Sequence, residues 1–275
     1  MKVASLSRIA AQIALLPLLT ASASAQTIMT EDDFQSYSVG AVLPTAAGGT
    51  HGAYSYAGAN PVYIQADPLD SDNKAVSVSA NGAATYLYAN ALAGTTKTFD
   101  QLAAAGQSLQ LSYDIYVSST NLNMFFASLQ YAGSTVFGTL YFKIPDRDGN
   151  AAVNYLVAGG AETSTGYSIS TNTWWTMTYD FYQLEDDSWA FAASMLNKAT
   201  QESIVLLKDQ AASVPNTSVN SFQRLNFYQY NTPTNVNTTY IDNLTLQIIP
   251  EPSIFCLLGL TTVGALFAFR RRAQP

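Results

Sequence analysis

The sequence has very little of the two residues that most often carry chemistry in enzymes, cysteine and histidine. Among 275 residues there is one cysteine, Cys256, and one histidine, His51. A chain with a single cysteine cannot form an internal disulfide, and this one offers neither a Cys–His nucleophile nor a histidine-rich zinc site. His51 follows Gly49-Thr50 and precedes Gly52, where a solvated turn residue is a simpler interpretation than a catalytic base.

Positive charge is also scarce between residues 26 and 249. This segment has seven basic and eighteen acidic residues, which give it a net charge of −11. Such a surface repels nucleic acid and other anionic polymers, whereas it is compatible with neutral polysaccharide and with divalent cations. We therefore expect no nucleic-acid partner.

Two common catalytic patterns are missing as well. The sequence has no Glu-x-Asp-x-x-Glu, which would place the two carboxylates of a glycosidase on one face of a strand, and no Gly-x-Ser-x-Gly elbow. The contiguous acids 185–187 alternate between faces and are typical of a hairpin tip. We therefore expect that the domain is not an enzyme.

The first 25 residues have the pattern of a secretory signal peptide. Its parts are a basic start with Lys2 and Arg8, an apolar run from Ile9 to Leu19, and a small-residue cleavage site at Ala23 and Ala25. The apolar run is too short to span a bilayer. The sequence therefore predicts that residues 1–25 are removed and that the mature protein starts at Gln26.

The last 26 residues, 250–275, form a second targeting segment. They begin with Pro250-Glu251-Pro252, continue with an uncharged stretch over residues 253–269, and close with Arg270-Arg271-Arg272. With Pro252 at its head, the apolar part would be a helix roughly 27 Å long, close to the bilayer core of about 30 Å, and the arginines favour the cytoplasmic side. We therefore predict a transmembrane helix at about 253–269. An ordinary single-pass anchor behind a chance Pro-Glu-Pro is the alternative.

In this order, the three parts of the segment resemble the PEP-CTERM sorting tail of Gram-negative bacteria. An exosortase recognises such tails and is thought to cleave them near the Pro-Glu-Pro. The resemblance implies a membrane-anchored precursor, with an exosortase-type transpeptidase or protease as its partner. It also implies that the mature protein is located at the cell surface or in the extracellular matrix.

Between the two ends, the recurring pattern is the period-two alternation of β-strands. We predict strands at 75–80, 85–88, 109–117, 125–131, 135–143, 151–157, 175–181, 189–195, 203–207, 224–227 and 240–248, with one short helix near 100–105. Many strands without crossover helices favour a single antiparallel two-sheet β-sandwich over residues 26–249.

Three stretches resemble parts of the jelly-roll sandwiches of concanavalin-A-like domains and carbohydrate-binding modules. They are the opening 31–40, the segment 173–180 with its paired tryptophans, and the final Tyr240-Ile241-Asp242-Asn243-Leu244. The resemblance implies a jelly roll and one structural calcium, held between Asp33 (or Glu31) and Asp242.

A second candidate calcium loop comes from spacing alone. Asp146, Asp148 and Asn150 stand at i, i+2 and i+4, which presents oxygen atoms to calcium in loop sites. The sequence then departs from an EF-hand, because Ala151 and Val157 occupy positions where that motif has glycine and glutamate. An Asp-Gly hairpin turn is the alternative.

Four aromatic residues fall out of phase with the core-facing positions of their strands. These are Trp174, Tyr116, Tyr228 and Tyr230, and on an exposed face they would be stacking platforms for sugar rings. The alternative is that they fill an ordinary strand face.

Two functions are consistent with these features. The first is an exported structural or adhesive protein of the cell surface or extracellular matrix. The second is a carbohydrate-binding module, or a degenerate glycan-active enzyme, on the same fold, with extracellular polysaccharide as its ligand.

Overall fold

The computed structural model describes residues 27–43, 54–58, 60–80, 84–89, 97–118, 124–131, 135–143, 150–156, 161–212, 222–230 and 237–250. Residues 28–248 form one compact unit. Its elements are β1 (Thr27–Asp32), β2 (Tyr54–Gly58), β3 (Tyr63–Ala66), β4 (Lys74–Ala80), β5 (Ala84–Ala89), α2 (Phe99–Ala104), β6 (Gln107–Val117), β7 (Met124–Tyr131), β8 (Thr135–Lys143), β9 (Asn150–Leu156), β10 (Thr163–Ser170), β11 (Trp174–Gln183), β12 (Trp189–Asn197), β13 (Ser203–Ala211), β14 (Phe222–Tyr230) and β15 (Asn237–Pro250).

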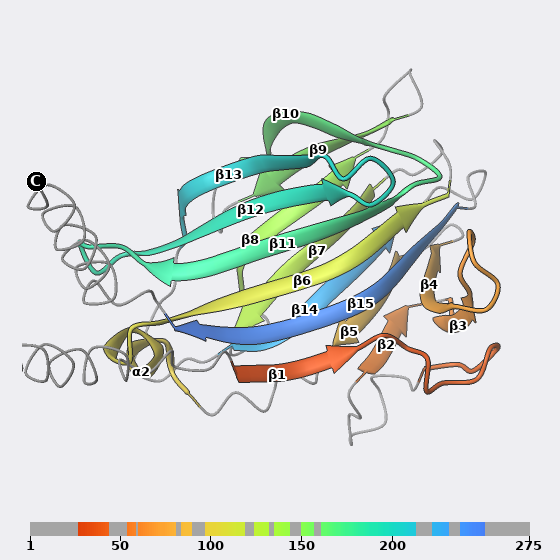
Figure 1. Cartoon of the computed structure of the whole chain (residues 1–275), viewed down its shortest axis with the longest axis horizontal. Coiled ribbons are helices and arrows are strands. Elements are labelled where there is room, and N and C mark those ends of the chain that lie inside the picture. The colour runs from red at the N-terminus through yellow and green to blue at the C-terminus, as the bar shows by residue number, and fades with distance from the viewer. Residues whose placement is uncertain are drawn as a thin grey trace, which may run out of the picture. The chain divides into compact units, whose positions relative to one another are not determined.

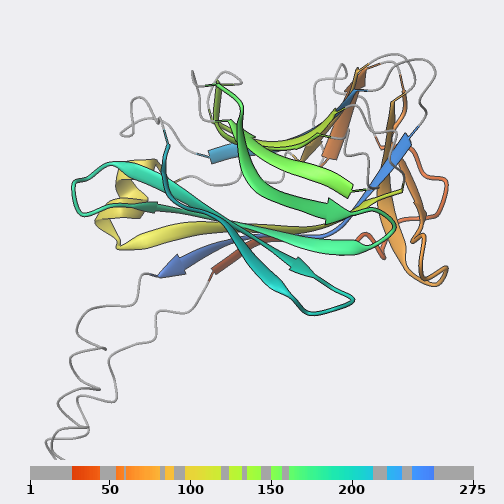
Figure 2. The same cartoon turned by 90° about the horizontal axis from the view of Figure 1, so that it is seen from above.

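These strands form two sheets that lie face to face (Figures 1 and 2). Sheet A has the order β13-β12-β11-β6-β15-β4-β3, and β1 also pairs with β15. Sheet B has the order β10-β9-β8-β7-β14-β5-β2. The pairings of neighbouring strands are antiparallel, as in the central β11–β6 and β14–β5 pairs. The prediction of an all-β, two-sheet sandwich is therefore confirmed.

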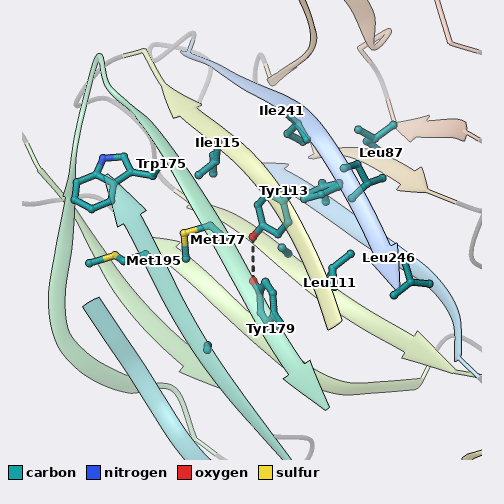
Figure 3. Packing of buried hydrophobic residues seen from close by; sticks show 14 of the residues in the cluster. Leu87, Leu111, Tyr113, Ile115, Trp175, Met177, Tyr179, Met195, Ile241 and Leu246 are labelled. Carbon is teal, nitrogen blue, oxygen red and sulfur yellow. Dashed lines mark hydrogen bonds between the residues drawn. The ribbon is translucent and has the colours of Figure 1, made fainter. Parts of the chain in front are cut away.

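The core between the sheets follows from the alternation on β6 and β11. Tyr113 and Tyr179, one from each strand, are at most 1 % exposed and point into the core beside Met177 (Figure 3). Their hydroxyl oxygens lie 2.9 Å apart, so one phenol donates a hydrogen bond to the other inside an apolar interior. Burial raises the pKa of both phenols well above the usual value, which keeps them neutral.

The short helix α2 is defined by its capping residues. Thr98 caps the N-terminus in a capping box with Gln101, and the side chains of Phe99 and Leu102 are buried. Phe99 meets the ring of Trp189 edge-on, with centroids 5.2 Å apart. The helix therefore attaches to sheet A near the start of β6.

The predicted strands are present, and the structure adds β1, β2, β3 and β10. Pro250 is the last residue of β15. The other predicted targeting residues lie outside the described part of the chain: Ala23, Ala25, Gln26, Glu251, Pro252, the span 253–269 and Arg270, Arg271 and Arg272. Over the residues that are described, no helix is long and apolar enough to cross a membrane.

Candidate functional site

Strand β15 departs from regular alternation in its middle. Ile241 and Leu244 both lie in the core although they are three residues apart, and Asn243 between them has a left-handed backbone with φ of 48°. An extra residue of this kind is the mark of a β-bulge, and asparagine tolerates that conformation better than most side chains. Strand β4 pairs only with residues 237–241 of β15, so the irregularity begins where this pairing ends.

Two buried carboxylates lie beside this irregularity on the outer face of sheet A. Asp114 and Asp242 are each 3 % exposed, and the side-chain amide of Asn243 donates to both, at 2.7 Å and 3.3 Å. The backbone N–H of Asn243 donates to Asp242 at 2.8 Å. We call Asp114, Asp242, Asn243 and Lys198 the bulge site.

Further donors complete the environment of the two carboxylates. Lys198 Nζ lies 2.5 Å from Asp114 Oδ2, and the hydroxyl of Thr176 donates to Asp114 Oδ1 at 2.5 Å. Asn73 Nδ2 donates to Asp242 Oδ2 at 3.2 Å. The ammonium therefore pairs with one carboxylate, whereas the other depends on neutral amides.

The lack of a direct cationic partner among the described residues affects the pKa of the Asp242 carboxyl. The surroundings together raise the pKa of this carboxyl to about 6; burial is the largest cause, and the nearby charge of Asp114 acts in the same direction. The hydrogen bonds from Asn243 and Asn73, and the charge of Lys198, lower the pKa and offset part of the effect. Asp242 therefore titrates in the mildly acidic range.

Asp33 and Asp242, the pair expected to hold calcium, are joined by protein groups. The backbone N–H of Gln35 donates to Asp33 Oδ1 at 3.1 Å, and the side-chain amide of Gln35 donates to Asn73 Oδ1. Asn73 in turn donates to Asp242. Two amides thus connect the carboxylates that the resemblance had assigned to one ion.

A lysine also occupies this region. Lys74 Nζ donates to the backbone carbonyl oxygens of Gln35 and Tyr37, at 2.6 Å and 2.8 Å. Carbonyl oxygens that converge in this way are typical ligands of hard cations, and here an ammonium binds them.

Next to the bulge lies a polar pocket of about 330 Å³. It is lined by Glu31, Asp32, Asp33, Asn243 and Thr245, and we call it the acidic pocket. Among the described residues, no group of three or more acidic, histidine or cysteine side chains is arranged to hold a metal ion. Asp146 and Asp148 of the second candidate loop lie outside the described residues, as does the side chain of Asn150.

The prediction that Trp174 and Tyr116 are exposed platforms is wrong. Both lie on the outer face of sheet A, but they are only 8 % and 5 % exposed. They are cross-strand partners with ring centroids 5.5 Å apart, and Tyr240 covers Tyr116 edge-on. The indole N–H of Trp174 donates to Asp67 at 3.1 Å. Because the rings cover one another, they form a small second apolar cluster.

Tyr228 lies elsewhere, on β14 of sheet B, and it is half-buried against Tyr86. Tyr230 ends β14, and its side chain is outside the described part of the structure. The four aromatic candidates therefore do not form one surface.

Sequence reasoning missed Asp114, Asn243 and Lys198. Asp114 was recognisable as an outward position of β6, and an Asp-Asn pair inside a strand is a weak signal for a bulge. The contact between Lys198 and Asp114 spans 84 residues, and no local pattern predicts it.

Comparisons with known proteins add the following. Residues 249–272 match the PEP-CTERM protein-sorting motif. No curated protein matches the sequence. One similar solved structure is the catalytic domain of a glycoside hydrolase family 131 protein from Coprinopsis cinerea, with 13% identity, 80% of this chain and 94% of that chain covered, and a TM-score of 0.49.

Two further structures are similar at the same level. Lectin II from Ulex europaeus has 7% identity, 82% and 99% coverage of this chain and of its own, and a TM-score of 0.48. A marine alginate lyase from Aplysia kurodai has 10% identity, 76% and 99% coverage, and a TM-score of 0.46. The sorting motif marks the chain as an exported protein, made as a membrane-anchored precursor and processed by an exosortase-type system.

Proposed function

We propose that the sandwich is a structural or adhesive domain of the cell surface or extracellular matrix, without catalytic activity. The observation that carries this proposal is that the two carboxylates Asp114 and Asp242 are buried and hydrogen-bonded within the protein. Each is 3 % exposed and accepts hydrogen bonds from protein donors on neighbouring segments. Their geometry suits a clamp that fixes strands in place.

A catalytic carboxylate needs a different environment. A general acid or base must come within about 3 Å of the proton that it transfers, or reach it through one water molecule. At Asp114 the ammonium of Lys198, the hydroxyl of Thr176 and the amide of Asn243 already take these positions. Hydrogen bonds between β6, β11 and β15 therefore support a stabilising role.

The position of the sorting motif also supports a surface role. Ile248 is 6 % exposed in the core, and β15 ends at Pro250, the first residue of the Pro-Glu-Pro sequence. The motif therefore follows the last core strand with no linker between them. We propose that the exosortase-type enzyme acts on the chain directly after this last core strand.

A structural calcium belongs to the same proposal, now at the acidic pocket. Carboxylate, amide and hydroxyl oxygens are the ligands that calcium prefers, and the pocket offers all three kinds. The ion would balance part of the negative charge of the domain. Asp33 and Asn243 would be its ligands. Asp242 accepts hydrogen bonds from Asn243 and would hold it in position.

Two measurements on the exported protein test this function. Incubation with extracellular polysaccharide should release no oligosaccharide, and deletion of the gene should reduce attachment of cells or retention of matrix, with recovery on complementation. Release of product by the wild type, abolished in an Asp114→Asn variant, would overturn the proposal in favour of a glycan-active enzyme.

A further inference from the structure

Sheet B carries a group of tyrosines on the face opposite the core. On β5, Leu87 is 1 % exposed and points between the sheets (Figure 3), so Tyr86 and Tyr88 lie on the other face. On β14, Phe227 is fully buried in the core, so its neighbours Asn226 and Tyr228 also lie on the outer face.

The pairing of β5 with β14 places these four residues side by side. Tyr228 is opposite Tyr86, and Asn226 is opposite Tyr88. The rings of Tyr86 and Tyr228 have centroids 4.7 Å apart at 53°, and those of Tyr86 and Tyr88 are 6.0 Å apart and nearly parallel. All three tyrosines are half-buried, so each keeps part of its surface open to solvent. We call the four residues the tyrosine site.

Asn226 gives the tyrosine site a polar group that lacks a partner. Its side chain is only 4 % exposed, and its Oδ1 is buried without a hydrogen bond in the described structure. A buried acceptor without a hydrogen bond destabilises the fold, whereas an apolar side chain of the same shape does not. A ligand with a hydroxyl donor would satisfy this oxygen, once the neighbouring rings tilt to admit it.

We infer that the tyrosine site binds a neutral saccharide, which deepens the proposed adhesive role and rests on it. Sugar rings combine C–H faces, which pack on aromatic rings, with hydroxyl groups, which donate to an amide oxygen. None of the four side chains carries a charge, and the domain's net charge of −11 disfavours uronate polymers. The glycan-binding surface is therefore the outer face of sheet B, which carries Tyr228, and not the outer face of sheet A, which carries Trp174.

Binding should be measured with the full-length protein in detergent. The probes are cellohexaose, xylohexaose and mannohexaose, with an alginate hexasaccharide as the anionic comparison. Tyr228→Ala should weaken binding of the preferred neutral probe about tenfold, because the variant loses the ring face on which the sugar packs. The matched control is Tyr167→Ala, an exposed tyrosine on β10 of the same sheet, which should bind as the wild type does.

Asn226→Leu separates binding from stability. The variant should lose binding while its melting temperature stays equal or rises, because it removes an unsatisfied acceptor. Unchanged binding in Asn226→Leu, equal effects of the two tyrosine variants, preference for alginate, or no binding of any neutral probe would each overturn the site. If cell attachment still depends on the protein in these cases, the proposed function stands and only this inference fails.

Discussion

Replacing Asp242 with asparagine should change how the stability of the sandwich depends on pH. In the folded domain, the pKa of this carboxyl is raised to about 6, mainly by burial, from the value of 3.8 that applies to the unfolded chain. Between these two values the folded state keeps a proton that the unfolded state releases. The stability that this proton contributes is complete below pH 3.8 and is lost as the pH rises through 6.

The size of the effect follows from the difference between the two pKa values. About two pH units at 1.36 kcal/mol each give roughly 3 kcal/mol of unfolding free energy. Screening by solvent does not reduce this much, because Asp242 is 3 % exposed. For a domain of this size, 3 kcal/mol corresponds to about 6–12 °C in melting temperature. Asparagine has no such titration, and its lost hydrogen bonds add an offset that does not vary with pH.

The assay compares urea and thermal unfolding of the 26–249 fragment from pH 4 to pH 7.5, followed by tryptophan fluorescence. Wild type should lose roughly 2 kcal/mol of this contribution relative to Asp242→Asn between pH 4 and pH 7, because part of it has already been lost at pH 4. The control is Asp187→Asn, at an exposed hairpin position whose φ of 64° suits asparagine. A difference between wild type and Asp242→Asn that stays constant across this range would refute the argument.

Three further predictions concern charge, metal and tail. Lys198→Met should lower the unfolding free energy by about 1–2 kcal/mol, since the lysine is 42% exposed, while Lys208→Met on β13 should change it little. Calcium at a hundredfold excess over its dissociation constant should stabilise the domain by about 2.7 kcal/mol, and an unchanged melting curve after chelation would exclude the ion. Replacement of Glu251 and Pro252 by alanine should leave uncleaved precursor in the membrane, whereas equal retention of residues 253–275 in wild type would favour an ordinary anchor.

The strands with a strong apolar alternation could be predicted from sequence, and the weak ones could not. β6 and β11 alternate over their whole length, so their core faces were evident. β10 has one buried residue, Ile169, and an internal Gly166, because it is an edge strand whose faces are mostly exposed. β3 has four residues, too few for a periodic signal.

The candidate sites show a second limit of sequence reasoning. Alternation correctly put Trp174 on the outer face of its strand, but it could not show that Tyr116 covers it and that Tyr240 packs on Tyr116. The bulge at Asn243 shifts the alternation of core-facing and outward residues in β15 by one position. A strict period-two pattern therefore assigns the wrong face to the residues on one side of the bulge. Contacts between strands decide both features, and these contacts join residues far apart in the chain.

The placement of β15 has a mechanical consequence for a protein held at a surface. This fourteen-residue strand lies between β6 on one side and β4 and β1 on the other, and it carries the C-terminal attachment point at Pro250. Tension on the attached end therefore acts along the strand, where its hydrogen bonds to both neighbours share the load and must slide together. An edge strand peeled from its end would instead release these bonds one after another. The membrane-anchored precursor is thus tethered through a strand that is hydrogen-bonded on both sides.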